Sequence, residues 1–439
     1  MEGNQTLQVV HLTSETVPAF EYPFLFRFLK IGNLIAQKKM NRSLFTLLES
    51  GKKKKRSVIG LMSGTSLDGL DIARCQITGW GESTSVHCSE FTTIPYSDSE
   101  KKLLKRVSSV ENVSLKEVCY IHTWLGRLHA KMILNALDGW NISSKTVDFI
   151  ASHGQTIYHL PARDLKENDW TPVNSTLQIG DADQIATLTG IATLSDFRQK
   201  HTAVGGEGAP MAGFVDEMLF TDKMESRILL NIGGIGNFTW LPAASGNRRK
   251  RFITDTGPGN TLIDKLTQIY FSKPFDRDAK IAGKGEVLEN LLIQCMDDPW
   301  FEEKGEKTTG PEYFSLEWLK HSINRSGITE ESLEPESLIR TMTELTARTI
   351  ARSVKDFVPA EERPVIYSSG GGARNPLMMR RISELLPELQ VRSSDLLGIN
   401  PDAKEAILFA VLANEMVAGE GFRMGADDQR VQFGKISLP

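Results

Sequence analysis

Two glycine-rich turns, one in each half of the chain, carry residue types that could bind a phosphate. The first follows the apolar run 58–62 and reads Ser63-Gly64-Thr65-Ser66-Leu67-Asp68-Gly69. Glycines let backbone N–H groups approach a bulky anion. Asp68 could ligate a divalent cation shared with the phosphate, because hard cations prefer oxygen ligands. The turn is not a Walker A loop, since it lacks Gly-Lys-Ser/Thr. A hairpin turn without a ligand explains this stretch alone equally well.

The second turn, Asn231-Ile232-Gly233-Gly234-Ile235-Gly236-Asn237, lies between the apolar runs 228–230 and 238–240. A single glycine-rich turn is weak evidence for a ligand. Two strand–turn–strand units could instead hold a polyphosphate from two sides. Their recurrence favours phosphate binding more than either turn does alone.

Other polar clusters follow predicted strands, where open α/β sheets bind ligands. His153, Gln155 and Thr156 could contact sugar hydroxyls, or could form a capped turn. Asp196 could take a proton from water or a hydroxyl and Arg198 could hold an anion, or the two could form a structural pair. Asp255 also follows a predicted strand. Glu312 could ligate a metal or only begin a helix. The three glycines 370–372 could seat an adenine ring or only turn the chain.

Apolar periodicity indicates which elements position these residues. We predict strands at 58–62, 71–77, 86–94, 147–152, 176–179, 191–194, 228–230, 252–254, 364–368 and 431–435. We predict helices at 97–107, 115–137, 182–189, 211–220, 261–271, 337–357 and from Pro401 through Met416, with Asn260 or Thr261 capping the fifth. This alternation predicts an α/β protein.

Length and composition limit the possible classes of protein. A chain of 439 residues predicts two domains, and a net charge of −4 gives no overall basic field for nucleic acid. The four cysteines are scattered and no apolar run is long enough to span a membrane, so we expect a cytoplasmic protein with no membrane partner. Residues 1–56 form an expected extension, with an apolar helix within 20–35. The basic run at 51–56 could be a nuclear address or a phosphate-facing patch, but such a run is more often a solvated linker. We expect the extension to be poorly ordered.

Together the motifs resemble one family, the anhydro-N-acetylmuramic acid kinases of the actin, hexokinase and heat-shock ATPase superfamily. The resemblance runs from about residue 57 to the C-terminus. Besides the two turns, it is carried by Ser152-His153-Gly154-Gln155-Thr156, Leu177-Gln178-Ile179-Gly180-Asp181, Asp196-Phe197-Arg198, Gly208-Ala209-Pro210, Asp255-Thr256-Gly257-Pro258-Gly259-Asn260, Lys307-Thr308-Thr309-Gly310, Gly370-Gly371-Gly372-Ala373-Arg374-Asn375-Pro376 and Ala403-Lys404-Glu405-Ala406.

The resemblance implies a two-domain, actin-like (ribonuclease H-like) fold with ATP and Mg²⁺ in a cleft. Domain I would span 57–224 and domain II 225–439, with the last helix returning to domain I. Such kinases phosphorylate O6 of 1,6-anhydro-N-acetylmuramic acid while water opens the anhydro ring, which gives N-acetylmuramic acid 6-phosphate and ADP in cell-wall recycling. Family members are commonly dimers, so we expect a homodimer.

Site roles follow by position in these motifs. Asp196 would be the base that activates water. The nucleotide would contact Gly64, Thr65, Ser66, Asp68, Gly69, Gly233, Gly234, Asn237, Gly257, Gly370, Gly371 and Gly372. Asp68 and Glu312 would hold the metal, and His153, Gln155, Thr156, Arg198 and Glu312 would contact the sugar.

Three positions depart from the family pattern and bear on substrate identity. His201 stands where an acid is usual, Glu207 where Gln is usual and Pro311 where Arg is usual. The alternative substrate is levoglucosan, an anhydro-glucose that lacks the amide and lactyl groups. A simple hexose kinase, or a non-catalytic nucleotide switch on the same fold, is a further alternative, and Asp196 favours the enzyme.

Overall fold

The computed structural model describes residues 41–162, 165, 171–209, 211–245, 251–310, 312–329, 333–424 and 429–439. It divides into two compact units, Met1–Thr46 and Leu47–Pro439. The sheets, the cavity and the site belong to the second unit. The expected helix within 20–35 lies outside the described residues, as do Pro210 and Pro311.

The basic run at 51–56 leads directly into the fold. Helix α2 (Arg42–Gly51) ends in this run and strand β1 (Lys55–Ser63) begins in it. Arg56 is only 3% exposed and donates to Oδ1 of Asn414 (2.5 Å) and to the carbonyl of Lys53 (2.5 Å). The expected end of the extension at residue 56 therefore falls inside β1.

The first sheet is built around β1. Strand β2 (Gly69–Thr78) pairs with it antiparallel, and β4 (Phe149–Leu160) pairs with it parallel. The strand order is β14-β6-β4-β1-β2-β3, with β5 paired to the end of β4. The remaining strands are β3 (Ser85–Pro95), β5 (Ser175–Ile179), β6 (Thr193–Ser195) and β14 (Lys435–Ser437).

The second sheet repeats this topology. Its order is β11-β10-β7-β8-β9, in which β8 is antiparallel to β7 and β9 while β10 is parallel to β7 and β11. The strands are β7 (Arg227–Ile232), β8 (Ile235–Leu241), β9 (Phe252–Pro258), β10 (Val365–Ser369) and β11 (Val391–Ser393). Two sheets with one shared strand order confirm the expected α/β, actin-like architecture.

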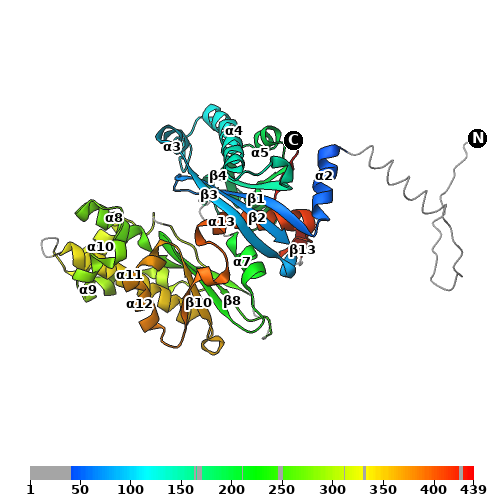
Figure 1. The fold of residues 1–439 in the computed structure, drawn as a ribbon. Coiled ribbons are helices and arrows are strands. Elements are labelled where there is room, and N and C mark those ends of the chain that lie inside the picture. Colours follow the sequence, from blue (N-terminus) through cyan, green and yellow to red (C-terminus); the bar gives the residue numbers. More distant parts are fainter. Residues whose placement is uncertain are drawn as a thin grey trace, which may run out of the picture. The chain divides into compact units, whose positions relative to one another are not determined.

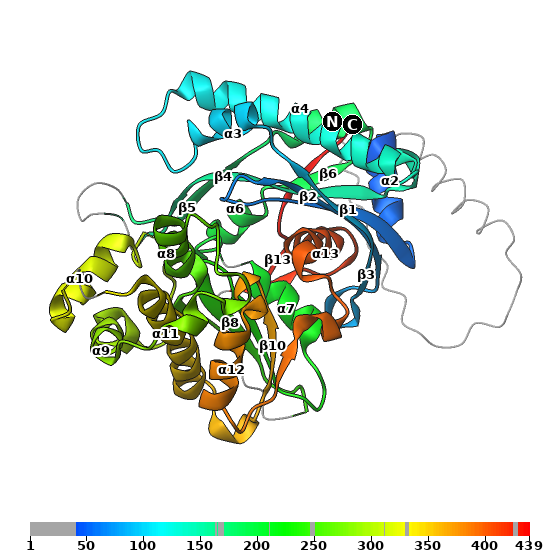
Figure 2. The same ribbon diagram turned by 60° about the vertical axis from the view of Figure 1, so that its left-hand side comes forward.

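Helices cover both faces of the first sheet (Figures 1 and 2). Alternate residues of a strand point to opposite faces, so Ile59 and Leu61 pack toward α4 (Leu115–Gly139) while Val58 and Met62 pack toward α13 (Lys404–Ala418). A Cβ at Gly60 would lie 1.9 Å from the carbonyl oxygen of Ala406, so only glycine allows this approach. The other helices of this half are α3 (Asp98–Lys105), α5 (Ala182–Thr189), α6 (Phe197–Thr202) and α7 (Ala212–Phe220).

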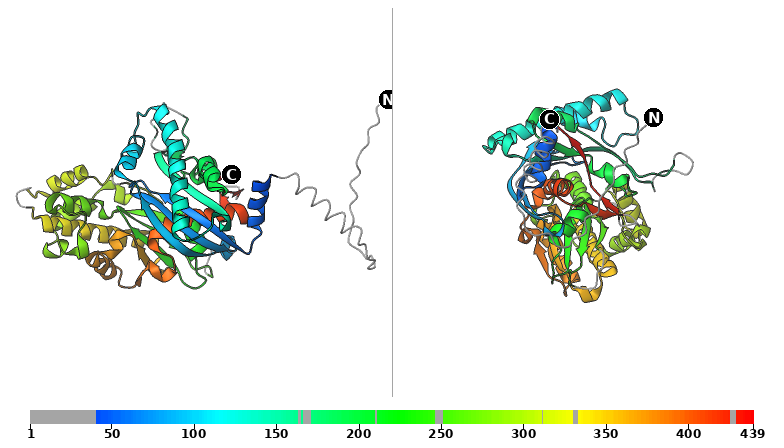
Figure 3. Two further views of the ribbon diagram at one scale, coloured as in Figure 1. Left: turned by 45° about the horizontal axis from the view of Figure 1, so that its top comes forward. Right: turned by 90° about the vertical axis from the view of Figure 1, so that its right-hand side faces the viewer.

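Helices of the second half gather on one face of the second sheet (Figure 3). Ile228, Leu230 and Ile232 of β7 belong to their core, whereas the alternate residues Leu229 and Asn231 line a cavity on the opposite face. These helices are α8 (Asn260–Phe271), α9 (Glu289–Met296), α10 (Leu316–Ser326), α11 (Pro335–Phe357) and α12 (Pro376–Leu385). The short strands β12 (Phe422–Met424) and β13 (Gln429–Val431) follow α13.

Several predicted boundaries were wrong. Strand β4 continues through residues 153–160 instead of ending at Ser152, because β5 pairs with its second half from Gln155 to Leu160. Strand β9 continues through Asp255 to Pro258, and Gly259 takes the cap position of α8. The single closing strand expected at 431–435 is two strands, β13 and β14.

Candidate active site

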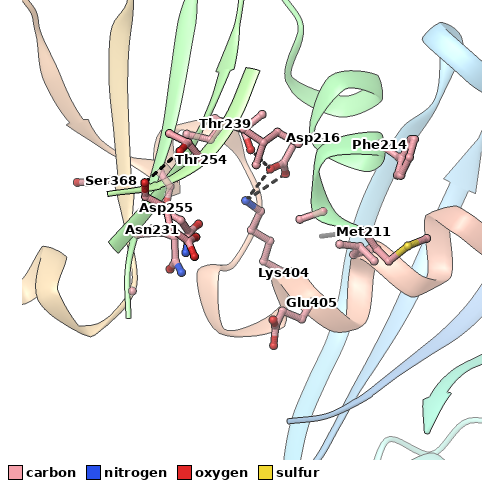
Figure 4. Close-up of a pocket in the computed structure, with 18 of the residues that line it drawn as sticks. Met211, Phe214, Asp216, Asn231, Thr239, Thr254, Asp255, Ser368, Lys404 and Glu405 are labelled. Carbon is pink, nitrogen blue, oxygen red and sulfur yellow. Dashed lines mark hydrogen bonds and ion pairs between the residues drawn. The ribbon is translucent and has the colours of Figure 1, made fainter. Parts of the chain in front are cut away.

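A cavity of about 1900 Å³ separates the second sheet from α7 and the start of α13. Figure 4 shows Asn231, Thr254 and Asp255 on the sheet side, with Lys404 and Glu405 of α13 opposite them. Ligand pockets commonly measure about 300–1,000 Å³. The cavity therefore has room for two substrates side by side.

The second glycine turn is fixed against the start of α8. The carbonyl of Gly233 accepts from the N–H of Asn260 (2.8 Å), and that of Gly234 accepts from the N–H of Gly259 (2.9 Å). A Cβ at Gly259 would lie 2.4 Å from the Gly233 oxygen. The turn and the helix start thus form one rigid backbone unit, with Asn237 of β8 lining the cavity beside it.

The triple glycine segment lies against the same turn. Gly370 has a φ of +83°, and a Cβ there would lie 2.6 Å from the carbonyl oxygen of Ile232. Gly370 and Gly371 line the cavity, while Gly372 is buried against Ile232. Two of the predicted nucleotide segments, the second glycine turn and Gly370–Gly372, therefore lie against each other beside the cavity.

Asp255 lines the cavity directly opposite Asn237 in the β8–β9 ladder. Its Oδ2 accepts from the backbone N–H of Thr309 (2.7 Å), and its own N–H donates to the carbonyl of Lys307 (2.9 Å). Burial raises the pKa of this carboxyl to about 6. Asp255 is thus an acid at the wall of the cavity, and it attaches the 306–309 loop to the sheet.

Gly257, which was predicted to contact the nucleotide, has a packing role in this structure. Gly257 has a φ of +121°, and a Cβ there would lie 2.8 Å from Cε1 of Phe301. The residue is buried and does not line the cavity.

The first glycine turn joins β1 to β2. Thr65, Ser66 and Asp68 are exposed on it, and none of the turn residues lines the cavity described above. A Cβ at Gly64 would have no heavy atom nearer than 3.7 Å, whereas one at Gly69 would lie 2.4 Å from the carbonyl oxygen of Ile94. Gly64 is therefore open to a ligand, and Gly69 lets β3 pack closely.

The three polar residues predicted to contact sugar lie within β4. His153 and Gln155 are buried at 4% and 0% exposure. His153 accepts from Nε of Arg198 (2.9 Å), and burial together with the Arg198 charge holds the pKa of His153 well below its usual range. Gln155 donates to the carbonyl of Gly64 (3.2 Å), while Thr156 accepts from Nε2 of Gln178 (3.2 Å).

Asp196 stands at the turn between β6 and α6. Its backbone is left-handed (φ 57°, ψ 35°), and its Oδ2 lies 3.2 Å from the ammonium of Lys435. Lys435 also donates to Oε1 of Gln199 (2.9 Å). Asp196 does not line the cavity, whereas Arg198 two residues on does.

The two predicted metal ligands, Asp68 and Glu312, are exposed carboxylates. A Cβ at Gly310 would lie 1.9 Å from Oε1 of Glu312, so this carboxylate is folded back over its own loop. Among the residues that the structure describes, no three potential ligands of the His, Cys, Asp or Glu type form a group that could hold a metal by themselves.

Comparison with known proteins identifies the family. The sequence model of the anhydro-N-acetylmuramic acid kinase family matches residues 56–421. The chain belongs to this family. It is 44% identical over 405 residues to the anhydro-N-acetylmuramic acid kinase of Pseudoalteromonas atlantica, covering 91% of this chain and 100% of the relative. It is 36% identical over 399 residues to the Caldanaerobacter subterraneus kinase of the same name, covering 89% and 99%.

Solved structures are more distant than these kinase relatives. A Clostridium difficile activator of 2-hydroxyisocaproyl-CoA dehydratase with bound ADPNP aligns with a TM-score of 0.37 at 10% identity, over 82% of this chain and 95% of its own. The Schistosoma mansoni hexokinase complexed with glucose aligns with a TM-score of 0.31 at 10% identity, over 89% and 100%. Within the described part of this kinase, no helix is long and apolar enough to span a membrane.

Three further residues line the cavity of this family member although the sequence analysis assigned them no task. Lys404 and Glu405 belong to a family motif and begin α13, whereas Asp216 belongs to no motif and comes from α7. Glu405 is exposed to the cavity, and desolvation raises its pKa. The one available signal was the resemblance of Ala403-Lys404-Glu405-Ala406 to the family pattern, which says nothing about what these side chains contact.

Proposed function

We propose that this kinase phosphorylates O6 of 1,6-anhydro-N-acetylmuramic acid with ATP while water opens the anhydro ring. The products are N-acetylmuramic acid 6-phosphate and ADP. The observation that carries the proposal is the family match over residues 56–421, within which relatives bear this kinase name. The cavity bordered by the second glycine turn and the Gly370–Gly372 segment supports it.

In the proposed reaction Asp196 is the base. Its carboxylate takes a proton from water, and the water oxygen bonds to C1 of the sugar. The C1–O6 bond breaks, and O6 keeps the electron pair and attacks the γ-phosphorus as ADP leaves. Positioning and charge neutralisation supply most of the acceleration in phosphoryl transfer, so ATP and sugar must meet in line.

Three segments of the chain would supply the proposed nucleotide contacts. Gly64, Thr65 and Ser66 would contact phosphate oxygens, and the backbone at Gly233 and Gly234 would do so from the second sheet. Gly370 and Gly371 would lie against the nucleotide. Arg198 is half-buried and lines the cavity, so it would face the sugar together with His153 and Thr156.

Mg²⁺ fits the carboxylates present. This ion usually takes only one or two protein carboxylates besides phosphate oxygens and water, and Asp68 and Glu312 are two exposed carboxylates. Asp68 and Glu312 would hold it, with Asp255 orienting a bound water from the second sheet. When bound, the ion would neutralise charge on the phosphates.

Turnover in ¹⁸O-water tests the proposal. We expect ADP release that depends on the anhydro sugar, with one ¹⁸O atom at C1 of the product. Sugar-dependent ADP release without label would show a simple hydroxyl kinase. Nucleotide binding without any sugar-dependent ADP release would show a non-catalytic switch.

The levoglucosan alternative depends on the side chains that would face the sugar. His201 and Glu207 line the cavity, and His201 accepts from the N–H of Gly208 (3.1 Å) and so shapes the 206–208 turn. A ratio of kcat/KM that favours levoglucosan over the muramic acid would overturn the substrate assignment.

We also propose that the kinase is a homodimer, as expected from the family resemblance. Light scattering on the purified chain should give twice the 48.8 kDa of one chain. A mass of one chain at all working concentrations would contradict this.

A further inference from the structure

We propose that His129 and Tyr96 position the first glycine turn for ATP through a chain of hydrogen bonds with one fixed direction. The inference rests on the proposed function, because it assumes that this turn contacts phosphate. It assigns His129 and Tyr96 a task, and it makes Gln155 a positioning residue for the turn.

The chain of hydrogen bonds links four buried side chains at the end of β1. Nε2 of His129 lies 2.7 Å from the hydroxyl of Tyr96, which lies 2.8 Å from Oγ of Ser63. Oγ of Ser63 lies 2.5 Å from Oε1 of Gln155. Nε2 of Gln155 then reaches the carbonyl of Gly64 at 3.2 Å. Exposure of the four residues is between 0% and 3%.

The direction of each bond follows from the Gln155 end. The amide nitrogen of Gln155 faces two carbonyls, those of Gly64 and Thr156, so its oxygen must face Ser63. An amide oxygen only accepts, so Ser63 must donate to it. With its proton committed, Ser63 must accept from Tyr96.

The same reasoning fixes the protonation of His129. Tyr96 donates its proton to Ser63, so His129 must donate Nε2–H to the Tyr96 oxygen. Nδ1 of His129 is buried without a hydrogen-bond partner in the described structure, so no acceptor there calls for a proton on Nδ1. Burial also lowers the pKa of His129 to about 3, which keeps the ring neutral.

The chain of hydrogen bonds holds both ends of the first glycine turn through Tyr96. Its hydroxyl acts through Ser63 and Gln155 on Gly64, and its backbone N–H donates to the carbonyl of Asp68 (3.1 Å). Between these two points lie Thr65 and Ser66, both exposed. Buried and fully connected polar networks make local structure rigid, so the network holds the donors for phosphate in one arrangement.

Substitution of the first two members tests the inference. Tyr96→Phe and His129→Leu each remove a donor, and we expect the Kd of Mg²⁺ with a non-hydrolysable ATP analogue to rise about tenfold or more. His129→Gln keeps an N–H at the place of Nε2 and should bind within about threefold of wild type. The matched control is Ser226→Ala, which removes a buried hydrogen bond from Trp240 (2.9 Å) of β8 in the second sheet.

Each outcome decides between the inference and a merely structural network. The inference is overturned if Tyr96→Phe and His129→Leu lose thermal stability but keep the wild-type Kd. It also fails if His129→Gln binds as poorly as His129→Leu. Absence of ATP-analogue binding by the wild type would instead refute the proposed function.

A spectroscopic measurement on the wild type does not depend on the folding of any variant. ¹⁵N NMR of the labelled full chain should show His129 as a neutral ring protonated at Nε2, with no titration between about pH 5 and 8. Protonation at Nδ1, or a charged ring in that range, would break the directed chain and overturn the inference.

Discussion

The ammonium of Lys404 lies 3.1 Å from Oδ1 and 3.3 Å from Oδ2 of Asp216. Asp216 is 4% exposed at its side chain, and its Oδ2 also accepts from the hydroxyl of Thr239 (3.3 Å). Three elements meet at this carboxylate, namely α7, α13 and β8, and Figure 4 shows the ion pair at the wall of the cavity. The ion pair therefore joins α13 to α7, and the hydrogen bond from Thr239 connects both helices to β8 of the second sheet.

Lys404→Met should destabilise the protein by about 3–5 kcal/mol, because it leaves the Asp216 carboxylate buried without a counter-charge. The free energy of unfolding in urea measures this loss.

The matched control for Lys404 is Lys280→Met. Lys280 also pairs with an aspartate, Asp278, at 3.2 Å, but both side chains are mostly exposed, at 74% and 60%. Such pairs contribute about 0–1 kcal/mol. Equal losses in the two variants would show that burial of Asp216 has no energetic consequence.

Asp196→Asn should reduce sugar-dependent turnover by about 10²–10⁴-fold, because general-base catalysis contributes that much. The Kd of the ATP analogue should stay unchanged. Lys435→Gln is the companion variant, and since Lys435 is 62% exposed its loss should change turnover by less than about fivefold. Near-normal turnover by Asp196→Asn would show that Asp196 is not the base.

The raised pKa of Asp255 should make the free energy of unfolding decrease as pH rises from about 4 to 6. Its pKa in the folded state, about 6, lies above the ordinary value of 3.8. Within that window the folded state binds more protons than the unfolded state, so deprotonation favours unfolding, by up to about 3 kcal/mol. Asp255→Asn should remove this part of the pH dependence in urea titrations.

Asp264 of α8 is the control for Asp255, because burial raises its pKa to about 6 as well but it does not line the cavity. Asp264→Asn should also change how the free energy of unfolding varies between about pH 4 and 6. It should leave the Kd of the Mg²⁺-bound ATP analogue unchanged. Asp255→Asn should weaken that binding. Identical binding by both variants would speak against a role of Asp255 at the nucleotide.

The two ends of the first glycine turn should respond differently to alanine. Gly69→Ala should lower the melting temperature, since its Cβ would lie 2.4 Å from the Ile94 carbonyl oxygen. Gly64→Ala meets nothing nearer than 3.7 Å, so it should keep the melting temperature and raise the KM for ATP. Loss of stability with an unchanged KM in Gly64→Ala would exclude this position from the phosphate contacts.

Local patterns in the sequence were sufficient for the strand–turn–strand units. The hairpin of β1 and β2 and that of β7 and β8 were predicted, because short apolar runs and glycine turns act within a few neighbouring residues. Helix α5 (Ala182–Thr189) was predicted with its observed bounds. The family resemblance then supplied the fold class and the kinase activity.

Contacts between distant parts of the chain were decided only by the tertiary structure. The continuation of β4 through Gln155 depends on pairing with β5, and the burial of Gln155 turns a residue expected at the sugar into a link between Ser63 and Gly64. Likewise, Lys404 meets Asp216 only because α13 packs back on the first sheet. Such partners leave no local pattern, since the packing of whole elements brings them together.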